Sequence, residues 1–291
     1  MELGIGLPAT IPGVEPRQIT DWAKAAEDAG FVSLGTIDRL VYPNYEPLIA
    51  LSAAAVVTER IRLTTSVLLA PLRNNDALLA KQALSLQDLS GGRLVLGMAV
   101  GGREDDYIAS KIDFHTRGSY FERQLENLKR FFAGEHVGFA GAIGPSQLPP
   151  PQIIIGGTVD AAFKRAARYG DGWIMGGAPP DQLPPAVEKL QAAWREEGRE
   201  GSPRVMALNY FSLGPDAEEN AQRYLTDYYG ILGEELAGYI ASSAAKSAEE
   251  IQQRNVLFEE AGCDELIWFP CSPDPEQVGL LAEAVDLASA R

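Results

Sequence analysis

The sequence predicts a (β/α)₈ barrel, or TIM barrel, with irregular insertions in its βα loops. Eight apolar segments alternate with helical patterns along the 291 residues, and such alternation implies a parallel sheet with helices outside it. Eight strand–helix units suit a barrel, for which about 250 residues is typical. The alternative is a doubly wound open sheet. A single domain over residues 1–291 is expected, because the alternation resumes after the Gly- and Pro-rich connection at 134–151.

The elements follow from hydrophobic periodicity. The strands, each apolar or β-branched, are expected at 3–7, 31–37, 61–69, 93–100, 152–155, 171–175, 204–213 and 265–269. The helices are expected at 16–29, 46–58, 75–89, around 121–132, 158–169, 181–197, in two or three pieces within 216–261, and after 274. Residues 101–116 are expected to form a long polar loop.

Residue types at the helix ends support these boundaries. Pro16 suits a first helical position, and Gly30 suits a left-handed cap at the other end of the same helix. The last helix has the pattern of a capping box, with Asp274 as the cap, Pro275 at the first position and Gln277 three residues after the cap.

One short sequence pattern recurs before two of the predicted strands. Residues 27–31 are EDAGF and residues 259–263 are EEAGC, so in both places a helix is expected to end at a Gly cap directly before a strand. The repeat indicates either a shared loop design or only that Ala-Gly is a common way for a helix to end.

The composition argues against several classes of partner. The chain has 40 acidic residues against 25 Lys and Arg, a formal net charge of −15, and no basic stripe, which argues against nucleic acid. Two His and two Cys are too few for a structural zinc site, so no metal is expected. No apolar run is long enough for a membrane span, and the N-terminus lacks the pattern of a signal peptide. A cytoplasmic protein is therefore expected.

Two double-glycine segments follow neighbouring predicted strands. Gly156 and Gly157 precede Thr158 at the start of a helix, and Gly176 and Gly177 come one unit later. Barrel active sites lie at this end of the strands. Glycine lets backbone N–H groups approach a phosphate, and a helix N-terminus favours an anion. The pair predicts a phosphate pocket, which Gly157→Asp would abolish with the fold intact; the alternative is that these glycines only form tight turns.

Other residues near this rim have a structural and a functional interpretation. Asp38 and Arg39 end the second strand as a surface ion pair or as functional groups. Residues 104–106 form a solvated acidic run or the cap of a short helix. His115 is a solvated side chain or touches the substrate. Trp173 is expected in the core.

Several ordered blocks resemble the luciferase-like monooxygenase superfamily, which comprises flavin- and deazaflavin-dependent oxidoreductases with a bacterial-luciferase-like barrel. The resemblance runs from about Gly4 to Phe269. The blocks are RIRLTTSVLLAP (60–71), LAKQ (79–82), LSGGRLVLG (89–97), RG (117–118), FE (121–122), IGG (155–157), Ala161, RAA (165–167) and GDGW (170–173).

The resemblance implies a site for FMN or coenzyme F420. Family members often carry a non-proline cis peptide just after the third strand, which here would be Ser66-Val67, followed by Leu68. Gly101 and Gly102 would lie near the ring or its ribityl chain. The glycine loops at 156–158 and 176–177 would hold the phosphate.

The sequence departs from the family at the second strand. Many members have Ser-Asp-His there, and the His serves the chemistry; this chain has Ile37-Asp38-Arg39. Arginine does not act as a proton shuttle, because its pKa exceeds about 12. Arg39 is the catalytic candidate, as a group that stabilises an oxyanion or binds an anionic substrate. No general base is identified.

The function expected from the resemblance is that of a flavin-dependent monooxygenase. It would use reduced FMN and O₂ on a small organic substrate, with a separate flavin reductase as a possible partner. The alternatives are an F420-dependent hydride-transfer oxidoreductase and a non-catalytic flavin-binding paralogue. A homodimer is expected from the resemblance. Substrate specificity is expected to lie in residues 101–116 and 214–246.

Overall fold

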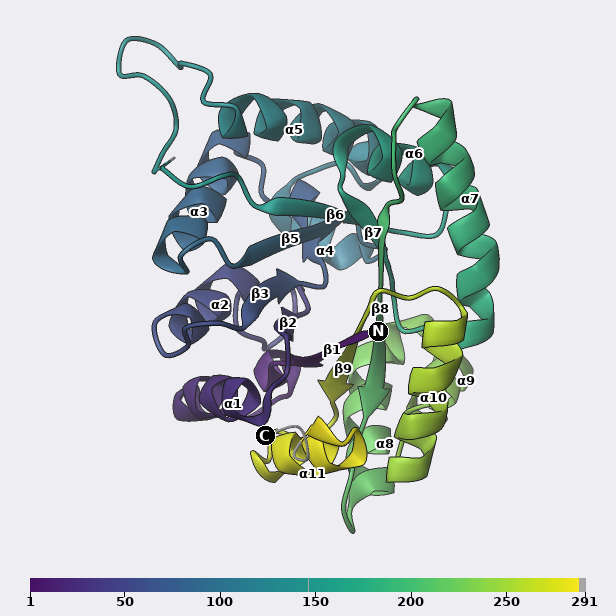
Figure 1. Cartoon of the computed structure of the whole chain (residues 1–291). Coiled ribbons are helices and arrows are strands. Elements are labelled where there is room, and N and C mark those ends of the chain that lie inside the picture. Colours follow the sequence, from purple (N-terminus) through teal and green to yellow (C-terminus); the bar gives the residue numbers. More distant parts are fainter. Residues whose placement is uncertain (146, 288–291) are drawn as a thin grey trace.

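Parallel strands form a closed barrel at the centre of the molecule, and helices surround it (Figure 1). The computed structural model describes residues 1–145 and 147–287. Within these ranges, the strands are β1 (Glu2–Gly6), β2 (Ser33–Thr36), β3 (Arg62–Thr65), β4 (Leu68–Leu69), β5 (Leu94–Ala99), β6 (Gln152–Gly156), β7 (Gly172–Met175), β8 (Arg204–Phe211) and β9 (Glu265–Pro270).

The helices cover the outside of this barrel. They are α1 (Pro16–Ala29), α2 (Pro47–Ala55), α3 (Asp76–Leu89), α4 (Glu104–Ser110), α5 (Arg117–Phe132), α6 (Asp160–Tyr169), α7 (Leu183–Glu196), α8 (Ala217–Tyr229), α9 (Glu234–Ser242), α10 (Ala248–Glu260) and α11 (Glu276–Ala284). Between α5 and β6, a teal excursion stands away from the body at the upper left of Figure 1 and contains the bridge between His136 and Ala142.

The strand order confirms a barrel and excludes the open-sheet alternative. The order is β3-β2-β1-β9-β8-β7-β6-β5-β4, all neighbours are parallel, and an additional β3–β5 pairing closes the ring. The predicted strand 61–69 is interrupted between β3 and β4, so these two segments together make one of the eight barrel strands.

Alternate residues of each strand enter two different cores, as the period of a strand requires. In β6, Ile153 and Ile155 pack between the barrel and its helices, whereas Ile154 lies in the cluster that fills the barrel. In β9, Trp268 and Phe269 divide in the same way. Trp173 is fully buried in the outer core, as predicted.

Charged side chains meet at the N-terminal ends of the strands. Glu265 is fully buried and accepts hydrogen bonds from Arg62 (2.9 Å), Arg204 (2.6 Å) and Ser33. Both arginines also bind Glu2. Two acidic and two basic groups thus neutralise one another at the N-terminal end of the barrel, called its floor below. In this fold that end contributes to stability and not to catalysis.

The two EDAGF-like segments have equivalent structures. Each helix ends at a glycine with positive φ, Gly30 (+99°) or Gly262 (+86°), and a strand follows within a few residues. Glu27 accepts three backbone N–H bonds from residues 59–61, just before the neighbouring strand β3. Glu259 accepts a 2.6 Å bond from the Met1 nitrogen, just before the neighbouring strand β1. The repeat is therefore a shared design, because both glutamates bind the start of the next strand.

Two local predictions need correction. Residues 101–116 contain α4 and a 3₁₀ turn at Phe114–Thr116 and are not simply a loop. Gln277 does not close a capping box with Asp274, because its buried amide bonds the backbone N–H and C=O of Leu213 instead (2.9 and 2.8 Å). Asp274 still accepts from the Glu276 N–H at the start of α11.

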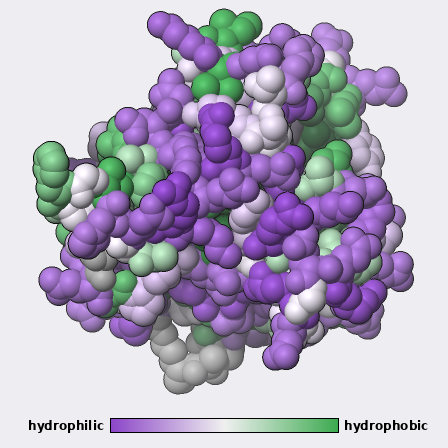
Figure 2. Space-filling model, turned by 90° about the horizontal axis from the view of Figure 1, so that it is seen from above, coloured by the Kyte–Doolittle hydropathy of each residue, from purple (hydrophilic) through white to green (hydrophobic). Residues whose placement is uncertain are grey.

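Hydrophilic side chains cover most of the face seen in Figure 2, with small separate hydrophobic patches among them. In the described ranges, none of the helices has both the length and the apolar composition needed to cross a membrane.

Candidate active site

A cleft opens at the C-terminal ends of the barrel strands, where this fold places its active sites. Its wall is built from the ends of β2, β7 and β8, the β3–β4 junction, the β5–α4 loop and the end of α8. The lining residues are Ile37, Asp38, Arg39, Ser66, Val67, Leu69, Gly101, Gly102, Arg103, Gly176, Gly177, Leu208, Tyr210, Tyr228 and Tyr229. Segments separated by almost 200 residues in the sequence therefore share one cavity.

Six of the ten predicted cofactor residues line this cleft together with Arg39. They are Ser66, Val67, Gly101, Gly102, Gly176 and Gly177. Leu68 does not line it, because its side chain is fully buried in the outer core.

Gly156, Gly157 and Thr158 also lie outside the cleft lining. The pairing of Gly156 with Ile174 puts the two glycine loops side by side, as predicted. However, the Gly157 carbonyl accepts from the Trp173 indole (2.7 Å), and Thr158 precedes α6 instead of opening it. Gly157 has φ +122°, and a Cβ there would stand 2.9 Å from the Ala162 Cβ. Gly157→Asp would therefore strain the backbone, contrary to the expectation of an intact fold.

The Ser66-Val67 peptide is cis, as the resemblance implied. Two glycines make room around it. A Cβ at Gly97 would lie 2.0 Å from the Thr65 carbonyl oxygen, and one at Gly156 would lie 3.2 Å from the Val67 side chain. The Ser66 hydroxyl is buried and has no hydrogen-bond partner among the described residues. Gly156 thus supports the segment below the cleft instead of lining it.

Arg39 is buried and forms an ion pair with Asp106 from α4. Its Nε donates to Asp106 (2.8 Å) and its Nη2 donates to Asp105 (3.2 Å) and the Val41 carbonyl (3.2 Å). Asp106 also accepts from the N–H groups of Leu40 and Val41. The Arg39–Asp106 pair is nearly inaccessible, with side chains 3% and 1% exposed. The solvated interpretation of residues 104–106 is therefore wrong for Asp106. A short helix is present, but Arg103 is its cap and residues 104–106 form its first turn.

Asp38 and Arg39 do not pair with each other. The buried Asp38 carboxylate binds Arg73 and the Leu69 N–H (2.8 Å). Burial raises the pKa of Asp38, and the Arg73 guanidinium opposes that effect. Because Arg73 and Leu69 bind its oxygens, Asp38 positions the β4 segment.

Tyr210, Tyr228 and Tyr229 form an aromatic wall of the cleft, and Tyr224 packs against two of them. The sequence analysis missed all four. The Tyr210 and Tyr229 hydroxyls share a hydrogen bond of 2.7 Å, and Tyr224 bonds Thr10 (2.6 Å). Tyr228 packs edge-on against Tyr229, with ring centres 5.0 Å apart. Burial raises the pKa of all four hydroxyls, so they stay protonated at neutral pH.

The cations beside this wall come from two other loops. The Arg103 and Arg39 guanidinium carbons lie 4.8 and 5.9 Å from the Tyr228 ring centre, within cation–π distance. Arg103 also donates to the Tyr228 carbonyl. The helical spacing of Tyr224 and the pair Tyr228–Tyr229 was the sequence signal that these side chains share a face. That this face contacts strand 204–211 could not be predicted from the spacing. His115 is exposed and is not among the residues that line the cleft.

The chain matches the luciferase-like monooxygenase family over residues 1–264. An uncharacterized protein of Mycobacterium tuberculosis is 32% identical over 224 residues, which cover 66% of this chain and 77% of that protein. An F420-dependent glucose-6-phosphate dehydrogenase of Amycolatopsis mediterranei is 28% identical over 211 residues, covering 64% and 63%.

Solved structures share the fold. A solved F420-dependent secondary alcohol dehydrogenase, in complex with an F420-acetone adduct, superimposes with a TM-score of 0.81 at 19% identity and 99% coverage of both chains. Family match, relatives and barrel architecture agree, and the chain belongs to the luciferase-like monooxygenase family of oxidoreductases.

Proposed function

We propose that this protein is a flavin-dependent monooxygenase that acts on a small organic substrate with reduced FMN and O₂. One observation carries the proposal: two polar groups of the cleft wall, Arg39 Nη1 and Ser66 Oγ, are buried without a hydrogen-bond partner among the described residues. An unpaired buried polar group is costly, so a bound molecule that pairs with both is expected to stabilise the site.

Glycines leave the cleft open to a ligand on two sides. A Cβ at Gly102 or Gly176 would meet no atom within 4 Å, so glycine leaves open space on two sides of the cleft. Ser66, Val67, Gly101 and Gly102 would hold the ring, and Gly176 and Gly177 the side chain. When bound, a reduced flavin would supply the two electrons with which one atom of O₂ enters the substrate and the other leaves as water.

The protein's own groups bind and orient the cofactor and the substrate, and they exclude water. Among the described residues that line the cleft there is no His, Glu or Lys, and Asp38 is already paired. Removal of a proton from an alcohol would need an acceptor that these side chains do not offer. This favours oxygenation, in which the cofactor carries the hard chemistry, over dehydrogenation.

The second candidate is F420-dependent hydride transfer to or from a small substrate. The relative that is an F420-dependent glucose-6-phosphate dehydrogenase favours it. The two candidates share the cleft and differ in the cofactor that the cleft prefers.

Cofactor titration tests the proposal. The purified protein is titrated with FMN and with coenzyme F420 by fluorescence quenching, and O₂ consumption is then followed with reduced FMN. We expect micromolar FMN binding that exceeds F420 binding. Preference for F420 without O₂ consumption would support the second candidate, and binding of neither would refute both and support a non-catalytic paralogue.

A matched pair of variants tests the position of the cofactor. Gly176→Leu is expected to weaken FMN binding by at least about tenfold, because its side chain enters open space at the cleft, with an unchanged melting temperature. Gly279→Leu, at an exposed glycine of α11 that also has no atom within 4 Å, is the control. Equal FMN affinity in both variants would contradict the assignment.

We also propose a homodimer, a separate flavin reductase as the source of reduced FMN, and a cytoplasmic location. Exposed apolar side chains on the neighbouring helices α2 and α3, among them Ile49 (63%) and Leu78 (54%), support self-association. The free, buried cysteines Cys263 and Cys271 support a reducing compartment. Light scattering on the wild type and on Ile49→Glu tests the dimer, which is refuted if the wild type is monomeric.

A further inference from the structure

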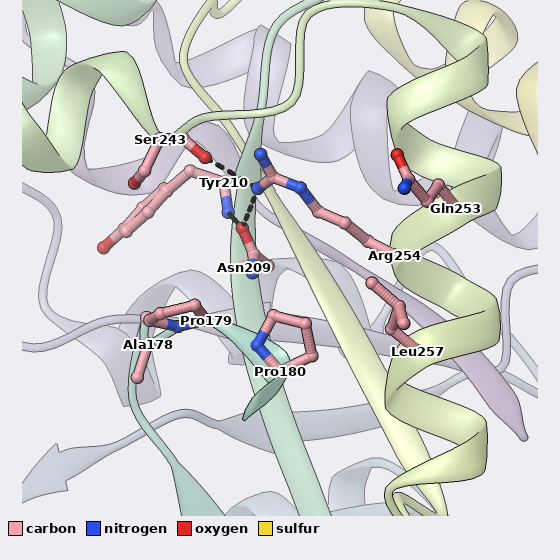
Figure 3. A pocket seen from close by; sticks show the side chains of 10 residues that line it. Ala178, Pro179, Pro180, Asn209, Tyr210, Ser243, Gln253, Arg254 and Leu257 are labelled. Carbon is pink, nitrogen blue, oxygen red and sulfur yellow. Dashed lines mark hydrogen bonds between the residues drawn. The ribbon is translucent and has the colours of Figure 1, made fainter. Parts of the chain in front are cut away.

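A second cavity adjoins the cleft on the side of α10 (Figure 3). The loop after β7, strand β8, the end of α9 and one face of α10 form its wall, and it shares Gly177 and Tyr210 with the cleft. The cavity measures about 260 Å³ and the cleft about 210 Å³. Each is smaller than the roughly 300–1,000 Å³ of an ordinary ligand pocket, and their combined volume falls within that range. A ligand of ordinary size would need the space of both and would pass the shared Gly177 and Tyr210.

Arg254 is the charged side chain among the described residues that line this second cavity. Its Nη1 donates to Asn209 Oδ1 (3.0 Å) and to the Ser243 carbonyl (2.6 Å), the dashed lines of Figure 3. Asn209 Oδ1 also accepts from the Tyr210 N–H (2.9 Å). The guanidinium is thus held between β8 and the end of α9, next to Tyr210, which lines both cavities.

Half of the guanidinium has no assigned partner. In residues 1–145 and 147–287, Nε and Nη2 of Arg254 make no hydrogen bond to protein, and no carboxylate lies within 4 Å of this side chain. Burial lowers the pKa of Arg254, although the group stays protonated at any physiological pH. Nε and Nη2 are accessible donors of a cation that forms no ion pair with a carboxylate among the described residues, and such a group can bind an external anion.

We infer that Arg254 binds a phosphate or carboxylate group of a molecule whose other end lies in the cleft. The planar fork of donors left on Arg254 suits the paired oxygens of such a group. The inference rests on the proposed function, because it assumes a ligand in the cleft. The anion belongs either to the side chain of the cofactor or to the substrate, and the chemistry of recognition is the same.

Three probes and three variants test the inference. FMN, riboflavin, which is the same ring without phosphate, and inorganic phosphate are titrated against the wild type, Arg254→Gln and Arg254→Lys. Arg195→Gln, an exposed charge on α7, is the control. If the anion is the cofactor phosphate, Arg254→Gln weakens FMN binding about tenfold or more and leaves riboflavin unchanged. Arg254→Lys restores part of the loss, and the riboflavin affinity of each variant reports an intact cleft.

If the anion belongs to the substrate, FMN and riboflavin affinities stay unchanged. Inorganic phosphate, measured by calorimetry on the FMN-loaded protein, then binds the wild type and not Arg254→Gln. The inference is overturned if Arg254→Gln and Arg195→Gln behave alike with all three probes. Failure of the proposed function is a separate result: neither FMN nor riboflavin binds the wild type, while phosphate binding to the free protein still depends on Arg254.

Discussion

Arg39 follows the end of β2, and its surroundings define what it can do. Asp106 and Asp105 balance its charge, and its Nη2 also donates to the Val41 carbonyl. Nη1 has no partner among the described residues and is left for a ligand. A guanidinium held in this way donates a hydrogen bond of fixed direction and does not exchange its proton. Oxyanion stabilisation or ligand orientation is the role that this geometry permits.

The two aspartates beside Arg39 are expected to differ sharply in their contribution to stability. Asp106→Ala leaves a buried guanidinium without its partner and should lower the free energy of unfolding by about 3–5 kcal/mol. Asp105→Ala, at a carboxylate that is 37% exposed, should cost less than about 1 kcal/mol. Chemical denaturation of both variants measures the difference, and equal losses would contradict the burial argument.

Both cysteines are expected to be unreactive in the folded protein. Cys263 and Cys271 are 5% and 1% exposed. Burial raises the pKa of the Cys263 thiol to about 12 and also raises that of Cys271, so almost no thiolate exists at pH 8. Titration with a thiol reagent should detect no fast-reacting group in native protein and two in guanidinium chloride. One fast native thiol would refute this prediction.

The location of a site residue could be predicted where it depends only on the residue's position relative to a strand. Arg39, Gly101 and Gly176 follow strands, so the barrel rule alone puts them at the rim. Asp106 was not predictable, because the partner that buries it is 67 residues away. Gly156 was predicted to follow a strand, but it is the last residue of β6 and packs against the Val67 side chain.

At the scale of elements, the third barrel strand shows what hydrophobic patterns do not predict. The apolar run 61–69 predicted one strand, and the structure divides it into β3 and β4. Composition alone does not reveal the division, since Ser66 and Val67 both occur readily in strands. At this point the Thr65 carbonyl approaches Gly97 on β5 so closely that a Cβ would not fit.

Two Gly→Ala substitutions of equal size are expected to have opposite effects. Gly97→Ala puts a Cβ 2.0 Å from the Thr65 oxygen and should destabilise the protein by about 3 kcal/mol or more. Gly279→Ala, in the exposed helix α11, should stabilise it by about 0.5–1 kcal/mol. Thermal unfolding compares them, and a wild-type melting temperature for Gly97→Ala would disprove the close approach.

At the scale of the whole molecule, the barrel was predictable because eight repeated units leave few topologies that bury every strand on both faces. The insertions were not predictable in detail. Helix α4 is held by buried polar contacts to the β2–α2 loop, and α8 presents a tyrosine face to strand β8. Such contacts between distant elements leave no periodic trace in the sequence.

Stability of the barrel is expected to fall in acid partly through Glu27. Although burial opposes it, hydrogen bonds from the N–H groups of Ile61, Arg60 and Glu59 lower the pKa of Glu27 below its usual 4.5. A lowered pKa in the folded state stabilises the fold above the unfolded value, and the contribution is lost as the pH falls through the folded value.

Glu27→Gln should therefore lower the free energy of unfolding by roughly 1 kcal/mol at pH 7. The difference from wild type should shrink as the pH falls below 4.5. Denaturant titrations at pH 7, 5 and 4 test this, with the exposed Asp28→Asn as control. A difference that does not depend on pH would show that the Glu27 charge plays no part.

The carboxylates that bind the start of a neighbouring strand have an evolutionary consequence. Glu27 and Glu259, and likewise Asp171 and Asp264, which accept from Ile153 and Val205, fasten adjoining units at the floor of the barrel. The residues that line the cleft lie at the opposite end of the barrel, in loops to which these four carboxylates do not bind. Apart from the buried ion pairs of Asp38 and Arg39, substitutions can therefore accumulate around the cleft, and new substrates can be explored, while the floor residues maintain the fold.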